Sequence, residues 1–334
     1  MTLTILICTA ALLLAELLYF KLAARLGIVD RPNARSSHSK PTIRGGGIVF
    51  PLAVLLYFLV SGFAYPWFFA GLMLLAVVEF TDDVRSLPDS IRLVAQFAGM
   101  ALMFLQLGLF GGAFPWWYVL VALVLFVGIV NAWNFMDGIN GITGGYSLAV
   151  LLPLLYIDTS VIPFIDMQLL LLTAAATLVF CIFNFRTRAR CFAGDVGSVS
   201  IAFIILFALG SLVLQTGDLS WLLLLCVYGV DTVLTICHRI MLHENLGQAH
   251  RKHAYQLMAN ELGIKHVSVS AFYSLLQLLI SSVAILLLPD SPAARWIYLG
   301  AVLVVLCTAY IIFMKKNYHL HEEYLKSKEA EKPC

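Results

Sequence analysis

Charged residues are scarce in this sequence. Only 12% of its 334 residues are Asp, Glu, Lys or Arg, whereas 61% are hydrophobic, and the mean hydropathy is +0.92. Soluble domains carry roughly 25% charged residues, so this composition indicates an integral membrane protein. Because a membrane-spanning helix needs roughly 20 apolar residues, the chain is long enough for about ten spans with short loops and no separate soluble domain.

The sequence also lacks a cysteine pattern and the marks of a cleaved signal peptide. The seven cysteines are scattered without the spacing of a disulfide framework or a metal site, and most lie in or beside apolar runs. No basic segment or small-residue cleavage site precedes Lys21. The first apolar run is therefore expected to be a membrane span.

Apolar runs separated by Pro, Gly and charged residues predict an all-α polytopic bundle in a single membrane domain, residues 1–334. We place eleven transmembrane helices near residues 2–22, 45–62, 66–80, 92–109, 115–133, 145–160, 168–185, 197–214, 219–237, 267–288 and 295–314. The loops expected on the cytoplasmic face lie near 23–44, 81–91, 134–144, 186–196 and 238–266, with a tail at 315–334.

The distribution of basic residues gives the orientation. With eleven spans, 20 of the 21 lysines and arginines fall on one side of the membrane, and only Arg295 falls on the other. Basic residues accumulate on the cytoplasmic side, so we expect the N-terminus outside and the C-terminus inside. Four aspartates in the outer turns are interpreted as turn or helix-cap residues: Asp158, Asp166, Asp218 and Asp290.

Five polar segments lie on the predicted cytoplasmic side. The first leads into the apolar run at 45–62, and the second follows the run at 66–80. The first, DRPNARSSHSKPTIRGGG, can be explained by the basic bias alone, or its glycines can let a ligand or another backbone approach closely at a helix start that favours an anion. The second, TDDVRSLPDS, contains the adjacent Asp82 and Asp83. These are either a solvated helix end partly neutralised by Arg85, or paired carboxylates that bind a divalent cation or supply a base.

The third and fourth segments combine amides, carboxylates and glycines. In NAWNFMDGINGITGG, the residues Asn131, Asn134 and Asp137 recur every three positions, so they share one helix face before the glycines break the helix. They suit a polar ligand or a helix–helix contact. In FNFRTRARCFAGDVGS, Asp195 is either a helix N-cap or, with three preceding arginines that include Arg190, part of a site for a phosphate and its metal ion.

The fifth segment, residues 237–266, holds five of the eight histidines. A cationic group at His250, Arg251 and His253 would suit phosphates, and an interfacial helix with a basic face is the alternative. Zinc is disfavoured because no cysteine or third ligand has suitable spacing. Two further acids lie within spans: Asp231 is close enough to reach the same site, and Glu16 has no evident role.

In this order the segments resemble the polyprenyl-phosphate N-acetylhexosamine-1-phosphate transferase family, over about residues 28 to 260. The motifs that carry the resemblance are SKPTIRGGG, DDVRSLP, NAWNFMDGING, FAGDVGS, the residues Asp231, Thr232 and Arg239, and HRKH. The segment HRKHAYQLM departs from the two or three close histidines common in the family. The chain therefore resembles the O-antigen-initiating branch more than the peptidoglycan translocase.

The resemblance implies a magnesium-dependent, or alternatively manganese-dependent, transfer of sugar 1-phosphate from a UDP-sugar to undecaprenyl phosphate, with release of UMP. It implies catalytic roles for Asp82, Asp83 and Asp195, and metal binding by Asp83, Asn134 and Asp195. The implied substrate-binding residues are Arg44, Asn131, Asn134, Asp137, Arg190, His250, Arg251 and His253. It also implies a location in the bacterial inner membrane. A homodimer is compatible with it, and no nucleic-acid partner is expected.

A transporter of an anionic solute is the main alternative from another class. Transporters place their charged sites near the membrane midplane and show internal repeats. Here the acidic motifs gather at one interface, and we find no clear duplication. The DGxxAR motif of CDP-alcohol phosphotransferases is also absent, so an enzyme of the resembled family is the expectation.

Overall fold

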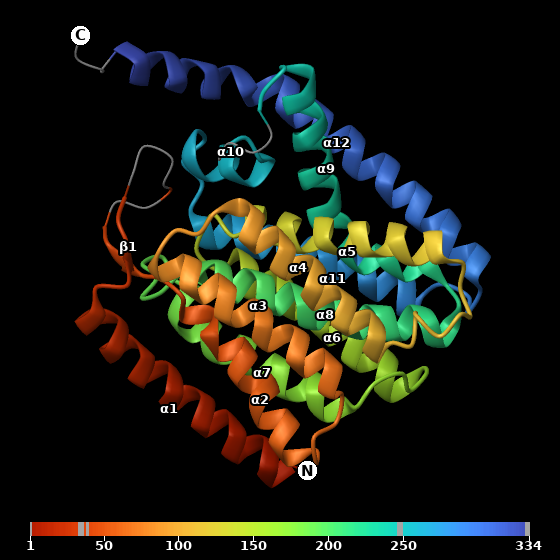
Figure 1. Cartoon of the computed structure of the whole chain (residues 1–334). Coiled ribbons are helices and arrows are strands. Elements are labelled where there is room, and N and C mark those ends of the chain that lie inside the picture. The colour runs from red at the N-terminus through yellow and green to blue at the C-terminus, as the bar shows by residue number, and fades with distance from the viewer. Residues whose placement is uncertain (1, 33–36, 38–39, 246–249, 331–334) are drawn as a thin grey trace.

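The computed structural model describes residues 2–32, 37, 40–245 and 250–330, and it is a bundle of helices (Figure 1). The α-helices are α1 (Thr2–Leu26), α2 (Val49–Val60), α3 (Pro66–Val84), α4 (Asp89–Gln106), α5 (Trp116–Met136), α6 (Ile142–Ser160), α7 (Met167–Asn184), α8 (Gly194–Thr216), α9 (Cys226–Met241), α10 (Ala254–Asn260), α11 (His266–Leu286) and α12 (Pro292–Ala330). Two 3-10 helices, η1 (Gly46–Ile48) and η2 (Leu219–Leu225), and two short strands, β1 (Val29–Asp30) and β2 (Thr42–Ile43), complete the described elements.

The predicted all-α membrane fold is confirmed, and every predicted span overlaps a helix. Within the described residues, eight helical segments are long and apolar enough to cross a membrane: α1, α5, α6, α7, α8, η2 with α9, α11 and α12. The other three predicted spans correspond to the short α2, to α3 with its three acids, and to α4. The count of eleven therefore stays a prediction.

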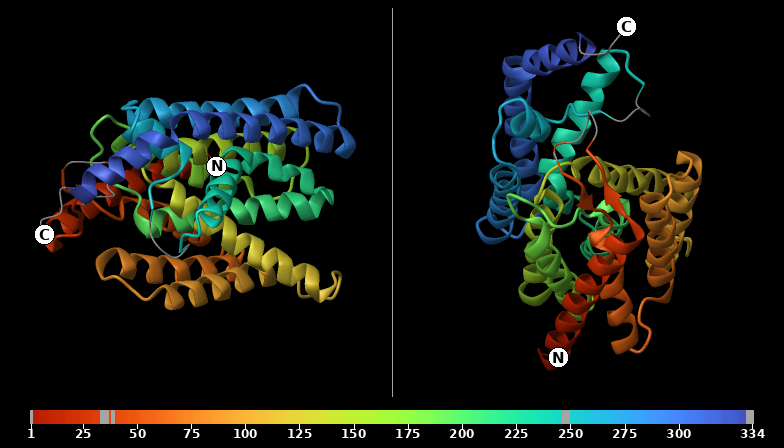
Figure 2. Two further views of the ribbon diagram at one scale, coloured as in Figure 1. Left: turned by 90° about the horizontal axis from the view of Figure 1, so that it is seen from above. Right: turned by 90° about the vertical axis from the view of Figure 1, so that its left-hand side faces the viewer.

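Helix α8 lies at the centre of the bundle, where it packs against α2, α3, α5 and α6. Its residues from Val199 to Ala208 are all buried, which explains why this stretch is apolar on every side. Helix α12 lies beside α9 and α11 along the outside of the bundle (Figure 2). Helix α8 thus runs through the core, and its first turn, which begins at Gly194, lies at one end of the bundle.

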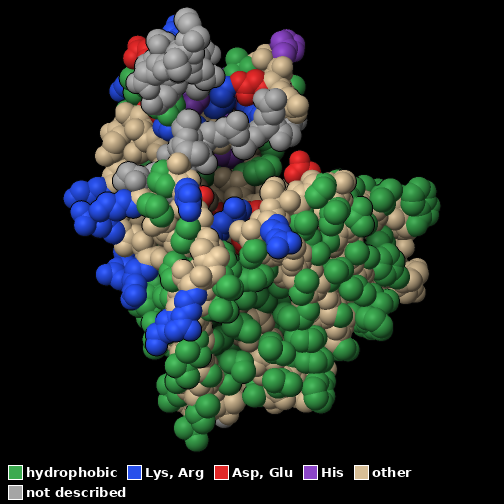
Figure 3. Space-filling model, turned by 60° about the vertical axis from the view of Figure 1, so that its left-hand side comes forward, with side chains coloured by type: hydrophobic (Ala, Val, Ile, Leu, Met, Phe, Trp, Pro, Cys, Tyr) green, Lys and Arg blue, Asp and Glu red, His purple; other side chains and the backbone are tan. Residues whose placement is uncertain are grey.

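The polar segments gather at one end of the bundle. The strands β1 and β2 pair there, α10 lies nearby, and α9 and α12 end beside it (Figure 1). Figure 3 shows hydrophobic side chains over the body of the molecule and a recess with Lys, Arg and acidic side chains towards this end. The parts of the predicted loops and tail at 33–36, 38–39, 246–249 and 331–334 lie outside the described residues.

The aspartates of the predicted outer turns serve as caps and ion-pair partners, as expected. Asp166 and Asp218 each accept a hydrogen bond from the backbone N–H two residues on, at 2.9 Å. Asp158 accepts from two backbone N–H groups of the loop before α7. Arg295, the single basic residue predicted on that side, pairs with Asp218 at 2.8 Å and Asp290 at 3.0 Å.

Candidate active site

The glycines of the first polar segment hold it against the start of α8. The N–H groups of Gly46 and Gly47 donate to the carbonyls of Phe192 and Ala193 at 2.8 and 2.9 Å. A Cβ on Gly47 would lie 2.2 Å from the Cα of Gly197. The glycine triplet therefore permits a close approach, as predicted, but the neighbour of Gly47 is the α8 backbone and not a ligand.

Asp83 caps the N-terminus of α8 from another helix. Its carboxylate accepts from the N–H groups of Asp195 at 2.9 Å and Val196 at 3.1 Å, and Arg44 Nε lies 2.6 Å from its Oδ1. A Cβ on Gly194, which has φ +71°, would lie 2.4 Å from Asp83 Oδ2, so only glycine fits there. Asp83 is buried, and these contacts occupy both of its oxygens.

Asp195 is the centre of an ion-pair network. Its Oδ2 lies 3.1 Å from Arg44 Nη2 and 3.3 Å from Arg92 Nη2. Arg92 also faces Asp82 at 3.4 Å and the buried Glu79 at 2.8 Å. The predicted helix-cap role of Asp195 is not observed, because no side chain caps α8 at its own N-cap residue and Asp83 takes the backbone N–H groups.

Asn134 orients Asp195. With its amide placed to satisfy both ends, its nitrogen donates to Asp195 Oδ1 at 3.1 Å and its oxygen accepts from Arg92 at 3.2 Å. In the opposite placement the oxygen accepts from Ser198 Oγ at 3.1 Å. The amide oxygen has a protein partner in either placement, so the arrangement favours an orienting role over the predicted metal-binding role.

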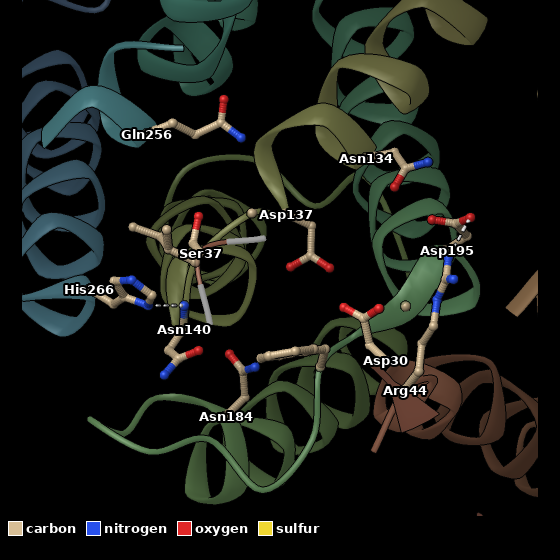
Figure 4. A pocket seen from close by; sticks show the side chains of 14 residues that line it. Asp30, Ser37, Arg44, Asn134, Asp137, Asn140, Asn184, Asp195, Gln256 and His266 are labelled. Atoms are coloured by element: carbon tan, nitrogen blue, oxygen red, sulfur yellow. Dashed lines mark hydrogen bonds and ion pairs between the residues drawn. The ribbon is translucent and has the colours of Figure 1, made fainter. Parts of the chain in front are cut away.

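A polar cavity of about 290 Å³ opens beside this network. Its lining includes Asp30, Arg44, Asn134, Asp137, Asp195 and Gln256. Figure 4 shows the carboxylates of Asp30, Asp137 and Asp195 turned towards the same space. Four segments predicted to form the site, the first, third, fourth and fifth, thus contribute to one cavity.

Asp137 contributes an acidic group with an altered proton affinity. It follows the last residue of α5, where the glycines end the helix as predicted, although Gly144 and Gly145 lie inside α6. Its Oδ1 accepts from Thr143 Oγ1 at 2.6 Å. Burial raises the pKa of Asp137 to about 6. A cation bound nearby would lower this pKa and favour the ionised carboxylate.

Five predicted substrate-binding residues lie outside the lining of this cavity: Asn131, Arg190, and His250, Arg251 and His253 of the histidine segment. Asn131 donates to Gln96 Oε1 at 2.7 Å and to a carbonyl of its own helix, although its spacing placed it on one face with Asn134. Arg190 packs its guanidinium over two aromatic rings, Phe20 and Phe183, at 5.7 and 5.8 Å from the ring centroids. Both contacts support the helix packing rather than a ligand.

The histidine segment is anchored by Asp231, the acid predicted to reach the site. Asp231 accepts from the backbone N–H groups of Ala254 and Tyr255 and lies 3.2 Å from His253 Nδ1. His250 lies against His253, with ring centroids 5.0 Å apart. Burial, helped by His253 and Arg239, lowers the pKa of His250 to about 3, so His250 is neutral at pH 7 and does not supply the predicted cation.

Arg251 lines a second cavity, of about 800 Å³, next to the first. The two cavities share Ser37, Asn140, Phe192 and His266. Basic side chains from four segments line the larger one, and the described residues that line it include no Asp or Glu. The lining cations are Lys40, Arg188, Arg251 and Lys265. This cavity suits an anionic ligand.

The acids that face the smaller cavity fit a magnesium ion. Magnesium prefers oxygen ligands, keeps several waters and is often bound by one or two carboxylates together with substrate phosphates. Asp137 and Asp195 offer two such carboxylates towards the cavity. No group of three or more His, Cys, Asp or Glu side chains among the described residues forms a complete metal site, so the remaining ligands would come from substrate and water.

Several residues of the site were missed in the sequence. Arg92 was counted only as part of the basic bias, and Glu79 was passed over in an apolar run, although a carboxylate there needs a partner. Gln256 and Asn184 give no signal in a single sequence. Asn184 supports the Gly141 loop, since its Oδ1 accepts from the Gly141 N–H at 2.8 Å.

The fold and the site define a polytopic membrane protein with an acidic and cationic site at one end of its helices. The profile of glycosyl transferase family 4 matches residues 65–213. This match covers less than half of the chain, and together with the relatives it supports the family that the sequence motifs resemble.

Curated relatives support the same assignment. The chain is 28% identical over 316 residues to a probable undecaprenyl-phosphate N-acetylglucosaminyl 1-phosphate transferase of Bacillus subtilis, covering 88% of this chain and 85% of the relative. It is 31% identical over 210 residues to an undecaprenyl-phosphate alpha-N-acetylglucosaminyl 1-phosphate transferase of Yersinia pestis, 57% of this chain and 56% of the relative. A protein of the same description from Thermotoga maritima is 26% identical over 278 residues, 77% of this chain and 83% of the relative.

Proposed function

We propose that this protein transfers N-acetylhexosamine 1-phosphate from a UDP-sugar to undecaprenyl phosphate. An oxygen of the lipid phosphate attacks the phosphorus that carries the sugar. The bond from this phosphorus to the UMP oxygen breaks, UMP leaves, and a lipid-diphosphate-sugar forms. The proposal rests on the family and on the relatives, whose descriptions name a polyprenyl phosphate and an N-acetylglucosamine phosphate.

The observation that carries the proposal is the position of the polar cavity. The reaction joins a water-soluble nucleotide to a phosphate confined to the membrane surface, so its site must lie at a helix end. Asp137 and Asp195 face a cavity at the end of apolar helices, and Arg44 lines the same cavity. The acids can hold a cation and the arginine can contact phosphate oxygens.

The donor would extend from the smaller cavity into the larger, cationic one. Arg251 then faces the phosphate at the nucleotide end of the donor, whereas Asp137 and Asp195 face the diphosphate through its metal ion. His253 orients the segment through Asp231. Because burial lowers the pKa of His250 to about 3, this histidine would contact a phosphate as a neutral hydrogen-bond donor and not as a cation.

Magnesium, or alternatively manganese, would be held by Asp137 and Asp195, and when bound it would offset the repulsion between the phosphates. Asn134 and Arg92 keep Asp195 in place for this task. Asp83 holds the first turn of α8, on which Asp195 stands. Asp82 lies beside Arg92 and outside the cavity lining, where we propose that it orients or deprotonates the acceptor phosphate.

We further propose that the product initiates the synthesis of O-antigen or another cell-envelope polysaccharide in the bacterial inner membrane. The histidine segment departs from the peptidoglycan branch, so the donor is a UDP-N-acetylhexosamine without an attached peptide, and a 6-deoxy form is included in this class. The N-terminus lies outside and the C-terminus in the cytoplasm, and a homodimer is compatible with this arrangement. The family match and the curated relatives favour this enzyme over a transporter.

A donor panel tests the proposal. Purified protein is incubated with undecaprenyl phosphate, magnesium and either simple UDP-N-acetylhexosamines, including 6-deoxy forms, or UDP-N-acetylmuramoyl-pentapeptide. We expect UMP release with at least one simple donor, and its loss when the metal is chelated. Turnover of the pentapeptide donor alone would refute the donor class, and no UMP release with any donor would refute the reaction.

A further inference from the structure

The cytoplasmic end of α12 packs against the histidine segment. The predicted span ends at residue 314, but α12 continues to Ala330. Beyond the span, Tyr318 lies against His238, with ring centroids 4.5 Å apart, and its ring is 5.8 Å from Lys252 Nζ. The Tyr324 ring lies 4.3 Å from the Arg251 guanidinium carbon. This part of α12 therefore covers the outer side of the segment that carries Arg251.

Glu261 joins these two elements through one carboxylate oxygen. Its Oε1 accepts from Arg251 Nη2 at 3.0 Å and lies 2.9 Å from His321 Nδ1. The side chains of Glu261 and His321 are only 3% and 1% exposed. If this buried carboxylate lost either partner, less of the cost of burying its charge would be offset. The three side chains are therefore expected to hold one another in place.

This contact determines where one cation of the larger cavity lies. Arg251 is buried, and its Nε has no hydrogen-bond partner among the described residues. Of the four cations that line the larger cavity, Lys40, Arg188 and Lys265 are exposed and Arg251 is buried. A long side chain that is fixed in this way loses less conformational entropy when it binds a ligand.

We propose that Glu261 is a positioning residue that, held by His321 of α12, fixes Arg251 at the wall of the larger cavity for the anionic part of the donor. The inference rests on the proposed function, because it assigns the donor to that cavity. It gives the cytoplasmic end of α12 a part in donor binding, although none of the described side chains of that end lines either cavity.

The test compares His321→Ala, His321→Asn and Glu261→Gln in the full chain. An asparagine amide nitrogen can replace histidine Nδ1 as a donor to Glu261. We expect His321→Ala and Glu261→Gln to raise the KM for the UDP-sugar about tenfold, as for the loss of one charge-assisted hydrogen bond, with kcat within about twofold. His321→Asn should restore most of the affinity, and Glu323→Ala, on the exposed side of the same helix, should change nothing.

Hydrogen exchange of residues 250–262 without substrate separates this inference from the proposed function. We expect faster exchange there in His321→Ala and wild-type exchange in His321→Asn, whether or not the protein turns over a UDP-sugar. Unchanged exchange and unchanged KM in His321→Ala would overturn the inference. A lower kcat and lower unfolding temperature with an unchanged KM would also overturn it, because they indicate only a structural role.

Discussion

At the scale of residues, Asp195 depends on neighbours from four distant parts of the chain. Arg44 precedes α2, Arg92 lies in α4, Asn134 lies in the last turn of α5, and Asp83 holds the backbone of Asp195 from α3. The adjacent Asp82 and Asp83, which stand out in the sequence, have different surroundings. Asp83 is a buried cap of α8, and Asp82 is half-buried beside Arg92.

The Asp82→Asn variant tests the role proposed for the second carboxylate. An amide of the same shape can still accept the Leu87 N–H bond observed at 2.6 Å, but it cannot take a proton. If Asp82 acts as a general base for the acceptor phosphate, kcat should fall by about 10²–10⁴-fold while UDP binding, measured by calorimetry with magnesium, changes little. Near-normal turnover would return Asp82 to the alternative of a solvated helix end.

The pH dependence of unfolding tests the neutral state of His250. The unfolded histidine takes up a proton below about pH 6.5, whereas burial keeps the folded one neutral down to a pKa of about 3. The unfolded state then binds more protons between these values, so stability falls as the pH falls from 6.5. We expect the unfolding temperature to drop less between pH 7 and 5 in His250→Gln than in the wild type, and parallel curves would contradict this.

At the scale of elements, the main helices could be predicted from the sequence but their contacts could not. Apolar runs bounded by Pro, Gly and charge gave segments that all overlap helices. The short α10 lies in the segment for which an interfacial helix with a basic face was the alternative, but its seven residues include no Lys or Arg and its N-terminus is held by Asp231 of another helix. The length of α12 was missed, since its last turns are polar and pack on the histidine segment.

The contact between η1 and α8 supports a prediction at this scale. Gly47→Ala would place a methyl group 2.2 Å from the Gly197 Cα, so the two backbones would have to separate and Asp195 would shift with α8. We expect a lower unfolding temperature and a loss of activity, both measured on purified protein. Gly128→Ala in α5, where nothing lies within 4 Å of the added Cβ, is the control and should be neutral, and equal effects would contradict the packing argument.

At the scale of the whole molecule, the sequence motifs indicated one polar site, and the fold brings four of the five segments to one cavity. Arg44, Asn134, Asp137 and Asp195 line it, because glycines and helix ends give recognisable signals. Asn131 and Arg190 turn elsewhere, since periodicity shows which helix face a residue occupies but not which neighbour that face meets. Arg92 was missed for the same reason.

The predicted orientation of the molecule can be tested by cysteine labelling. In a variant that keeps only Cys334, which lies outside the described residues, a membrane-impermeant maleimide should label the protein only after the membrane is opened, since 20 of the 21 basic residues fall on the same predicted side. Gln215→Cys, at the opposite end of α8 from Asp195, should be labelled without opening it. Labelling of Cys334 from outside would contradict the orientation.

The most direct test of the central claim is the lipid product formed by wild-type protein and by Asp195→Asn, assayed side by side with undecaprenyl phosphate, magnesium and an accepted UDP-sugar. The account predicts equimolar lipid-diphosphate-sugar and UMP from the wild type. It predicts no product from the variant, whose neutral amide is a poor magnesium ligand and leaves Arg44 and Arg92 without their shared carboxylate. Unchanged unfolding temperature would show that the fold is intact. Product formation by a well-folded Asp195→Asn at the wild-type rate would contradict the claim that transfer takes place at this site.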